Sequence, residues 1–246
     1  MYTYKEIKNS FPKEKEKLES LYGRIVPVRK LSYLFTVPLI NIGFSAFQVS
    51  IVSIFFAVAG CITLAINNKY FVIAGIVLVF LWHIFDCVDG NIARVRKSAS
   101  KLGEFVDACS GYFVMAFLPF SIGIAAFNEG LFLEDKKYLY IIIGGVSAIC
   151  ELLMRLIHQK YAYTLAVIEN KEGSHLEKGD NPYQLSGFHK LRKMIDIECG
   201  PLGLPMFVLF LAPFFKLFFL LDLYYCLFHI ASLIVASIYY IGKGRK

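Results

Sequence analysis

The sequence predicts an all-α integral membrane protein with six transmembrane helices. Three observations support this: an apolar composition, long uncharged runs, and an uneven distribution of basic residues. Hydrophobic residues make up 57% of the 246-residue chain and charged residues only 18%, which is too apolar for an ordinary soluble globule. A helix needs roughly 20 apolar residues to cross a hydrocarbon core of about 30 Å, and several runs reach that length. These runs lack the strict alternation of apolar and polar residues that membrane β-barrel strands show.

The apolar runs divide the chain into spans separated by turns and by one longer polar stretch. Asn67, Asn68 and Lys69 close the first run, and the turn there is so short that the next helix must run antiparallel. Residues 169–200 are polar, are interrupted by glycine and proline, and are expected to form a loop with some helix. We place the spans at residues 45–66, 70–96, 100–127, 138–161, 202–218 and 222–241, all within a single membrane domain covering residues 1–246.

Residues 1–30 are predicted to form a juxtamembrane segment. Between residues 3 and 22, apolar side chains recur among many lysines with a loose helical spacing, which is typical of an amphipathic helix on a membrane surface. A solvated helix is the alternative. No short apolar stretch with a cleavage site follows the basic N-terminus, so no signal peptide is expected. The six cysteines form no CxxC pair and are expected to be reduced core residues.

The basic residues predict the orientation in the membrane. With six spans, both termini lie on one side, and 22 of the 26 lysines and arginines lie on that side with them. Lysine and arginine are enriched in cytoplasmic loops, so both termini are expected to face the cytoplasm in the cytoplasmic membrane. This topology explains the net charge of +7 better than nucleic-acid binding does. No nucleic-acid partner is therefore expected.

The chemically informative segment is FDCVDGNIARVRKSASKLGEFVDACSG, residues 85–111. Asp86 lies about 16 residues after the start of the second span, or roughly 25 Å across the bilayer, which is close to the cytoplasmic boundary. Asp86 and Asp89 are three residues apart and share a helix face, which Gly90 and Ala93 continue. This face therefore carries two acids and no bulky side chain.

Asp107 follows on the next predicted helix, one turn after Gly103. Carboxylates held close together repel each other unless a cation or proton lies between them, and oxygen-rich clusters suit Mg²⁺ or Mn²⁺. The alternative for two acids at a helix end is a solvated cap. Three acids on apolar spans are costly in a membrane and instead indicate a functional site, so Asp86, Asp89 and Asp107 are the predicted metal ligands.

The same residues resemble the signature of the CDP-alcohol phosphotransferases, DxxDGxxARx8GxxxDxxxD. The matching positions are Asp86, Asp89, Gly90, Ala93, Arg94, Gly103 and Asp107, seven of the eight fixed positions. Ser100 falls where many members have serine, and residues 29–50 look like the family's approach to its first helix. Together with the predicted topology, the resemblance covers most of the chain.

The resemblance implies transfer of a substituted phosphate from a CDP-alcohol donor to a hydroxyl acceptor, a lipid or polyol, with release of CMP at the cytoplasmic side. It also implies a role in phospholipid biosynthesis among membrane lipids, and a homodimer. A divalent metal would neutralise the diphosphate and stabilise the leaving CMP. Asp86 and Asp107 are the implied catalytic residues; the implied CDP-binding residues are Asp89, Gly90, Ala93, Arg94, Ser100 and Gly103.

The eighth signature position is Gly111 instead of aspartate. In the family this aspartate is a metal ligand and the base that deprotonates the acceptor, and a glycine does neither. Three explanations stay open: another group supplies the base, the protein is impaired, or the sequence is an altered variant. His83, one turn before Asp86, is one candidate substitute, although a lone histidine on an apolar helix is more often a packed residue.

The fourth span carries Glu151, Arg155 and His158 on one polar stripe. Glu151 is the second candidate for the missing carboxylate; the alternative is that Glu151 and Arg155 pair to hide their charges from lipid. Arg155 is also a candidate for binding the acceptor.

Two further basic residues lie before the fifth predicted span, and the single tryptophan lies in the second. Lys190 and Arg192 are candidates for binding an anionic acceptor, and a positive-inside anchor is the alternative. Trp82 is assigned to lipid contact and packing.

Two functional hypotheses follow. The first is an active metal-dependent phosphotransferase, and the second is a catalytically impaired or non-catalytic relative that binds nucleotide or lipid, which Gly111 keeps open. A transporter is disfavoured because the acids lie near one face, whereas carriers usually bind at the midplane.

Overall fold

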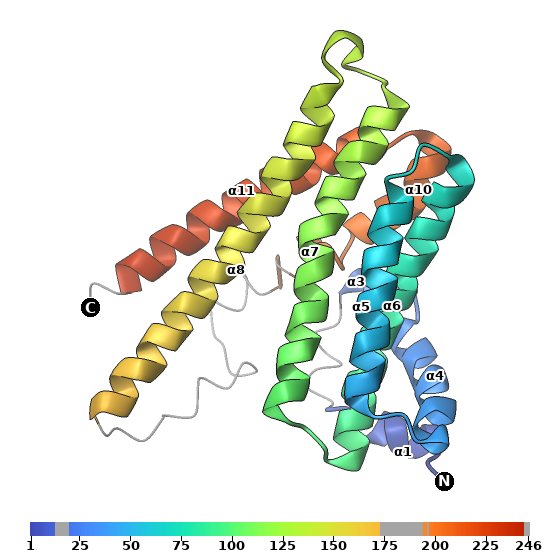
Figure 1. Cartoon of the computed structure of the whole chain (residues 1–246), viewed down its shortest axis with the longest axis vertical. Coiled ribbons are helices and arrows are strands. Elements are labelled where there is room, and N and C mark those ends of the chain that lie inside the picture. Colours follow the sequence, from blue (N-terminus) through green and yellow to red (C-terminus); the bar gives the residue numbers. More distant parts are fainter. Residues whose placement is uncertain (13–19, 173–193, 196, 244–246) are drawn as a thin grey trace.

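The computed structural model describes residues 1–12, 20–172, 194–195 and 197–243, and every regular element in these ranges is helical (Figure 1). Within these described ranges, five helices are long and apolar enough to cross a membrane. They are α5 (Ala46–Leu64), α6 (Lys69–Arg96), α7 (Lys101–Glu129), α8 (Tyr138–Glu172) and α11 (Phe218–Lys243). The prediction of an all-α membrane protein is confirmed at this level, and the starts of these helices lie within four residues of the predicted ones.

The fifth predicted span, residues 202–218, corresponds to a much shorter helix, α10 (Pro205–Phe215). Its 11 residues extend about 17 Å, roughly half of a hydrocarbon core, so a sixth complete crossing is not confirmed. Pro205 occupies the first turn, where proline is tolerated, and Lys216 ends the helix in the left-handed region. The Lys69 ammonium lies 5.3 Å from the centroid of the Phe214 ring, so α10 ends beside the start of α6.

Helix α8 continues well beyond the predicted end at residue 161. Residues 162–172 include neither glycine nor proline, so nothing in the local sequence interrupts the helix before Gly173. The predicted span 138–161 is therefore too short, and the helix extends into the stretch 169–200 that was expected to form a loop with some helix. A short 3₁₀ helix, η1 (Glu134–Lys136), lies in the turn before α8.

The N-terminal region folds into short pieces: α1 (Tyr4–Asn9), α3 (Leu21–Ile25) and a longer helix, α4 (Val28–Ile42). A continuous amphipathic helix over residues 3–22 is not formed, because α1 ends at Asn9 and Pro12 follows shortly after. Thr3 and Glu6 start α1 with a reciprocal capping box. The Ile7 side chain is fully buried, and α1 packs against α4.

The long helices pack in two groups. Helix α5 packs extensively against α6 and α7, and α8 packs against α7 and α11 (Figure 1). Glycine allows close contact in both groups: a Cβ atom on Gly75 of α6 would lie 2.8 Å from the Gly60 carbonyl oxygen of α5, and one on Gly144 of α8 would lie 2.8 Å from the Pro119 carbonyl oxygen of α7. Helices α6 and α7, which carry the acids, touch only sparsely. Space therefore remains between them.

Candidate active site

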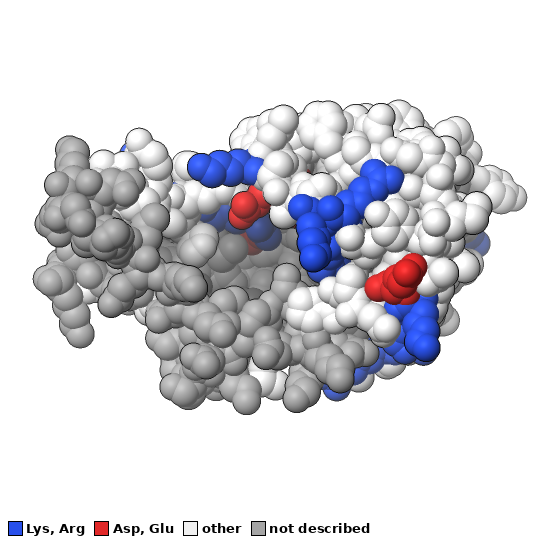
Figure 2. Space-filling view, turned by 90° about the horizontal axis from the view of Figure 1, so that it is seen from below, with Lys and Arg blue, Asp and Glu red and all other residues white. Residues whose placement is uncertain are grey.

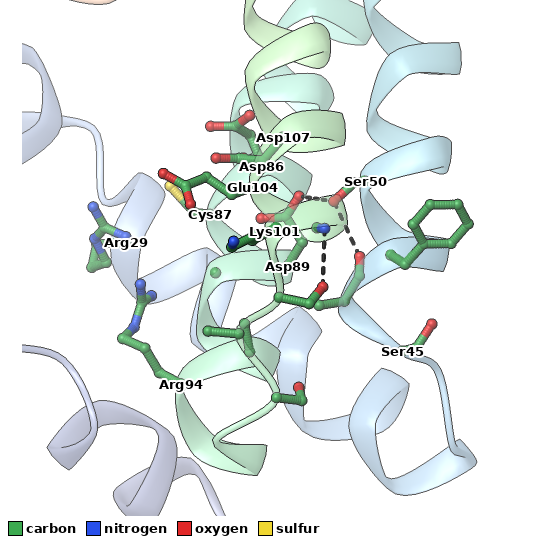
Figure 3. Close-up of a pocket in the computed structure, with 18 residues that line it drawn as sticks. Arg29, Ser45, Ser50, Asp86, Cys87, Asp89, Arg94, Lys101, Glu104 and Asp107 are labelled. Atoms are coloured by element: carbon green, nitrogen blue, oxygen red, sulfur yellow. Dashed lines mark hydrogen bonds between the residues drawn. The ribbon is translucent and has the colours of Figure 1, made fainter. Parts of the chain in front are cut away.

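A cavity of about 720 Å³ opens where α6 leads into α7. Figure 2 looks at this end of the bundle and shows lysine and arginine side chains gathered around a hollow. The cavity walls come from α4, α5, α6, the turn after α6, and α7 (Figure 3). Eight of the predicted site residues line it: Asp86, Asp89, Gly90, Ala93, Arg94, Ser100, Gly103 and Asp107. The predicted donor site is thus brought together in one place.

Asp89 is the most buried acid of the cavity, with 3% of its surface exposed. The Ser50 hydroxyl from α5 donates a 2.5 Å hydrogen bond to its Oδ2 atom (Figure 3). The hydrogen bond joins α5 to the signature helix at the site. Sequence analysis did not single out Ser50; the available signal was a hydroxyl one turn into an apolar span.

Arg94 is held by a chain of polar contacts that reaches α4. Its Nη2 atom donates to Asn91 Oδ1 at 2.7 Å, and Asn91 Nδ2 donates to the hydroxyl oxygens of Ser32 and Thr36, each at 3.1 Å. A Cβ atom on Gly90 would lie 3.1 Å from Arg94 Nη1. Gly90 therefore leaves room for the guanidinium group against α6. Asn91 was also missed, because its partners on α4 lie more than 50 residues away in the chain.

Ser100 and Gly103 have a structural role at the rim of the cavity. The Ser100 hydroxyl accepts a 3.0 Å hydrogen bond from the Gly103 amide and caps the first turn of α7. This cap starts α7 directly beside the end of α6. Asp107 follows one turn later and faces the same cavity.

The three aspartates offer hard oxygen ligands of the kind that Mg²⁺ and Mn²⁺ prefer. Asp86 and Asp107 project from α6 and α7 toward the same part of the cavity, whereas Asp89 is turned toward Ser50 (Figure 3). Asp86 lies within electrostatic range of both other acids, and a cation would relieve this repulsion. Within the described residues, no three histidine, cysteine or acidic side chains lie close enough together to form a metal centre. The donors therefore fit the metal in chemical type, and Asp86 and Asp107 face one another, but the described side chains do not form a ready-made three-ligand site.

Gly111 lies one turn beyond Asp107 on α7, and nothing in the structure requires glycine there. A Cβ atom built on it meets no atom of the described residues within 4 Å, and its backbone is not in the left-handed region. A larger side chain, including aspartate, therefore has room at this position.

His83 lies outside the group of residues that line the cavity. Its ring centroid is 6.1 Å from that of Tyr22 and 6.1 Å from that of Trp82. Trp82 is 1% exposed, and its Nε1 atom donates to the Ser110 hydroxyl at 2.8 Å, so its assignment to packing is confirmed and that to lipid contact is wrong. Helix α6 rotates this face toward the protein instead of toward lipid.

Glu151 and Arg155 form an ion pair on α8, in which the Arg155 Nε and Nη2 atoms lie 2.7 and 2.6 Å from Glu151 Oε1. His229 of α11 faces the other carboxylate oxygen at 3.8 Å, and Glu151 is 3% exposed. Neither Glu151 nor Arg155 lines the cavity. Lys190 and Arg192 lie outside the described residues.

The cavity also contains residues that sequence analysis did not select. Glu104 lies on α7 one turn before Asp107, and Arg29 projects from α4. Glu104 lies within the quoted segment, but its position does not belong to the signature. Arg29 is distant in sequence, and only the packing of α4 on α6 brings it to the site.

Comparison with known families matches residues 44–236 to the family described as CDP-alcohol phosphatidyltransferase. A comparison with curated proteins gave no significant match. The matched residues begin just before α5 and extend into α11, and they contain the acids of the cavity. Since the match covers well over half of the chain and includes the signature residues, the chain belongs to the CDP-alcohol phosphatidyltransferase family.

Proposed function

We propose that the protein transfers a substituted phosphate group from a CDP-alcohol to a hydroxyl of a lipid or polyol acceptor and releases CMP. Membership of the family supports transfer of a phosphate-linked alcohol group from a CDP-alcohol. The observation that carries the proposal for this chain is that eight of the signature and associated residues line a single cavity. The cavity volume of about 720 Å³ is in the range of small-molecule sites.

The reaction is proposed to occur at the cytoplasmic face of a six-span, homodimeric protein in the cytoplasmic membrane. The distribution of basic residues supports this orientation, since the turn after α6 and the N-terminal segment are both basic. Helix α10 ends beside the start of α6, as a chain returning toward the outer side requires. In this arrangement a soluble nucleotide and water reach the cavity directly.

The cavity residues divide the work of the reaction. Asp86, Asp89 and Asp107 would hold Mg²⁺ or Mn²⁺, which supplies charge neutralisation for the diphosphate. The acceptor oxygen attacks the β-phosphorus, the bond from that phosphorus to the oxygen bridging to the α-phosphate breaks, and CMP leaves with the bond electrons. Arg94 binds phosphate oxygens and stabilises the charge that grows on them.

The acceptor hydroxyl must lose its proton, and Gly111 has no group to take it. Glu104 is the candidate that the structure adds, because it is an exposed acid that lines the cavity and precedes Asp107 by one turn. Glu151 and His83 stay as alternative bases, although neither lines the cavity. Arg155, Lys190 and Arg192 stay proposed contacts for the acceptor.

The test is CMP release by the purified full-length protein, supplied with Mg²⁺ or Mn²⁺, a panel of CDP-alcohols and a panel of acceptors. Asp86→Asn is expected to reduce CMP release by at least 100-fold, because it removes a charged ligand and leaves the other acids in place. Asp135→Asn, at the distant turn before α8, makes the same chemical change outside the cavity and is the control. Equal activity of Asp86→Asn and wild type would refute the proposed site.

The second candidate function is nucleotide or lipid binding without turnover, and the open space at Gly111 is the observation that favours it. This function predicts that the wild-type protein binds CMP but does not produce CMP from any CDP-alcohol. Gly111→Asp is then expected to gain turnover, since the new side chain has room. Glu104→Gln distinguishes the two, because it abolishes turnover only where Glu104 is the working base.

A further inference from the structure

Phe11 brings the N-terminal segment to the edge of the cavity, although it lies more than 70 residues before the signature. The Phe11 side chain is 8% exposed, and the Arg29 Cζ atom lies 4.2 Å from the centroid of its ring. The Arg94 Cζ atom lies 5.2 Å from the same centroid. Both arginines line the cavity, and Figure 3 shows them on the same side of it. One aromatic ring thus contacts the two guanidinium groups together.

The segment that carries Phe11 is anchored to α4 independently of these arginines. The Tyr2 amide donates to Asn41 Oδ1 at 2.7 Å, and Asn41 Nδ2 donates back to the Tyr2 carbonyl at 2.9 Å. The Tyr4 ring packs edge-on against Tyr33 with centroids 5.8 Å apart, and Ile7 is fully buried. Phe11 is therefore presented by a fixed segment.

Two neighbouring guanidinium groups repel each other, and a ring beside both relieves part of this repulsion through its negative face. A guanidinium group carries five N–H donors, so contact with one aromatic ring leaves others for further partners. Arg94 uses Nη2 to bind Asn91, and its buried Nε atom has no hydrogen-bond partner among the described residues. The Nε atom of Arg94 can therefore donate a hydrogen bond to a bound anion.

We propose that Phe11 positions Arg29 beside Arg94 as a two-arginine site for a phosphate group of one of the substrates. Planar guanidinium groups match phosphate oxygens in pairs, which favours this ligand over a simple anion. Arg29 is the added binding residue, and Phe11 is the positioning residue. The inference deepens the proposed function, since it rests on that function for the substrates that bring the phosphate.

Binding to the full-length protein tests the site without requiring turnover. Affinities for CDP and for glycerol 3-phosphate are measured by calorimetry for wild type, Arg29→Gln and Phe11→Leu. Arg29→Gln is expected to weaken one of these ligands by about 10-fold or more, as loss of a hydrogen-bonded charge does. Loss with CDP assigns the site to the donor, and loss with glycerol 3-phosphate assigns it to a phosphorylated acceptor. Phe11→Leu is expected to weaken the same ligand, and Phe11→Tyr to restore it, since the ring is kept.

Matched controls separate this site from general electrostatics and from loss of the N-terminal fold. Lys30→Gln removes the same charge from the next, exposed position, which does not line the cavity, and is expected to leave both affinities unchanged. Tyr4→Leu removes a ring of the same segment that contacts Tyr33 and neither arginine, and because Asn41 and Ile7 still hold the segment, both affinities are expected to stay unchanged. Unchanged affinities in Arg29→Gln, or equal losses in Lys30→Gln, would overturn the proposal. Absence of turnover in wild type would refute the proposed transfer alone.

Discussion

Substitution of Gly144 by alanine tests the close packing of α8 on α7, and its neighbour Gly145 provides the control. A Cβ atom on Gly144 would lie 2.8 Å from the Pro119 carbonyl oxygen and 3.1 Å from the Gly123 Cα atom, both closer than ordinary contacts of 3.4–4 Å. A Cβ atom on Gly145 meets nothing within 4 Å. Both positions lie in the same helix, so the gain in helix propensity, about 1 kcal/mol, is common to them.

The expected difference follows from these contacts. Overpacking costs about 1–3 kcal/mol, so Gly144→Ala should be less stable than Gly145→Ala by about that amount. The neighbouring atoms at Gly144 belong largely to backbone, which yields less than a side chain does. For a chain of this size the apparent unfolding midpoints should differ by about 2–12 °C, with Gly145→Ala the higher.

The measurement is thermal unfolding of both variants in the same detergent, at one scan rate because unfolding of membrane proteins is often irreversible. CMP release at low temperature serves as a second readout, since the cavity lies at the other end of α7. An equal rise of the midpoint in both variants would show that α7 and α8 are not packed as closely as described.

Two further predictions concern the site and the N-terminal segment. Ser50→Ala should weaken CMP binding in the presence of Mg²⁺ by about 10-fold or more, because a hydrogen bond to the charged Asp89 is worth about 1.5–3 kcal/mol. Ser53 is also buried but has no hydrogen bond to Asp89, so Ser53→Ala should leave CMP binding unchanged. Equal losses of affinity in the two variants would contradict a specific role of Ser50. The pKa of Glu6 lies below its usual value because Thr3 donates hydrogen bonds to it. A lowered folded-state pKa means that this stabilisation of α1 is present above the pKa of an unfolded glutamate and is lost as the pH falls through the lowered value. The hydrogen-exchange protection factors of α1, taken relative to the intrinsic exchange rate at each pH, should therefore fall in acid for wild type and show no such pH step for Glu6→Gln.

The boundaries of the long helices were largely predictable because membrane crossing imposes a local requirement on the chain. A helix must bury its own backbone polar groups along the full hydrocarbon thickness, so an apolar run of sufficient length is visible in the sequence itself. The prediction of a membrane-spanning helix failed for the fifth span, where the apolar run is long but the helix in it is short. Residues 202–218 are apolar enough, but Pro205 and Lys216 bound a helix of only 11 residues.

The site was half predictable for a similar reason. Asp86, Asp89 and Asp107 were found because their spacing on two consecutive helices and their cost in a membrane are both local properties. Ser50 and Arg29 were not, since each reaches the cavity only through the packing of α5 or α4 against α6.

By itself, the sequence determined that the chain crosses a membrane as helices, that acids lie at the end of the second long helix, and that residue 111 has no carboxylate. Only the tertiary structure decided what surrounds those acids. It placed Ser50 on Asp89, set Phe11 against two arginines, and brought no atom of the described residues within 4 Å of a Cβ at Gly111. The spacing of side chains along one helix depends on neighbouring residues, whereas a cavity is formed by segments whose proximity depends on the packing of the whole chain.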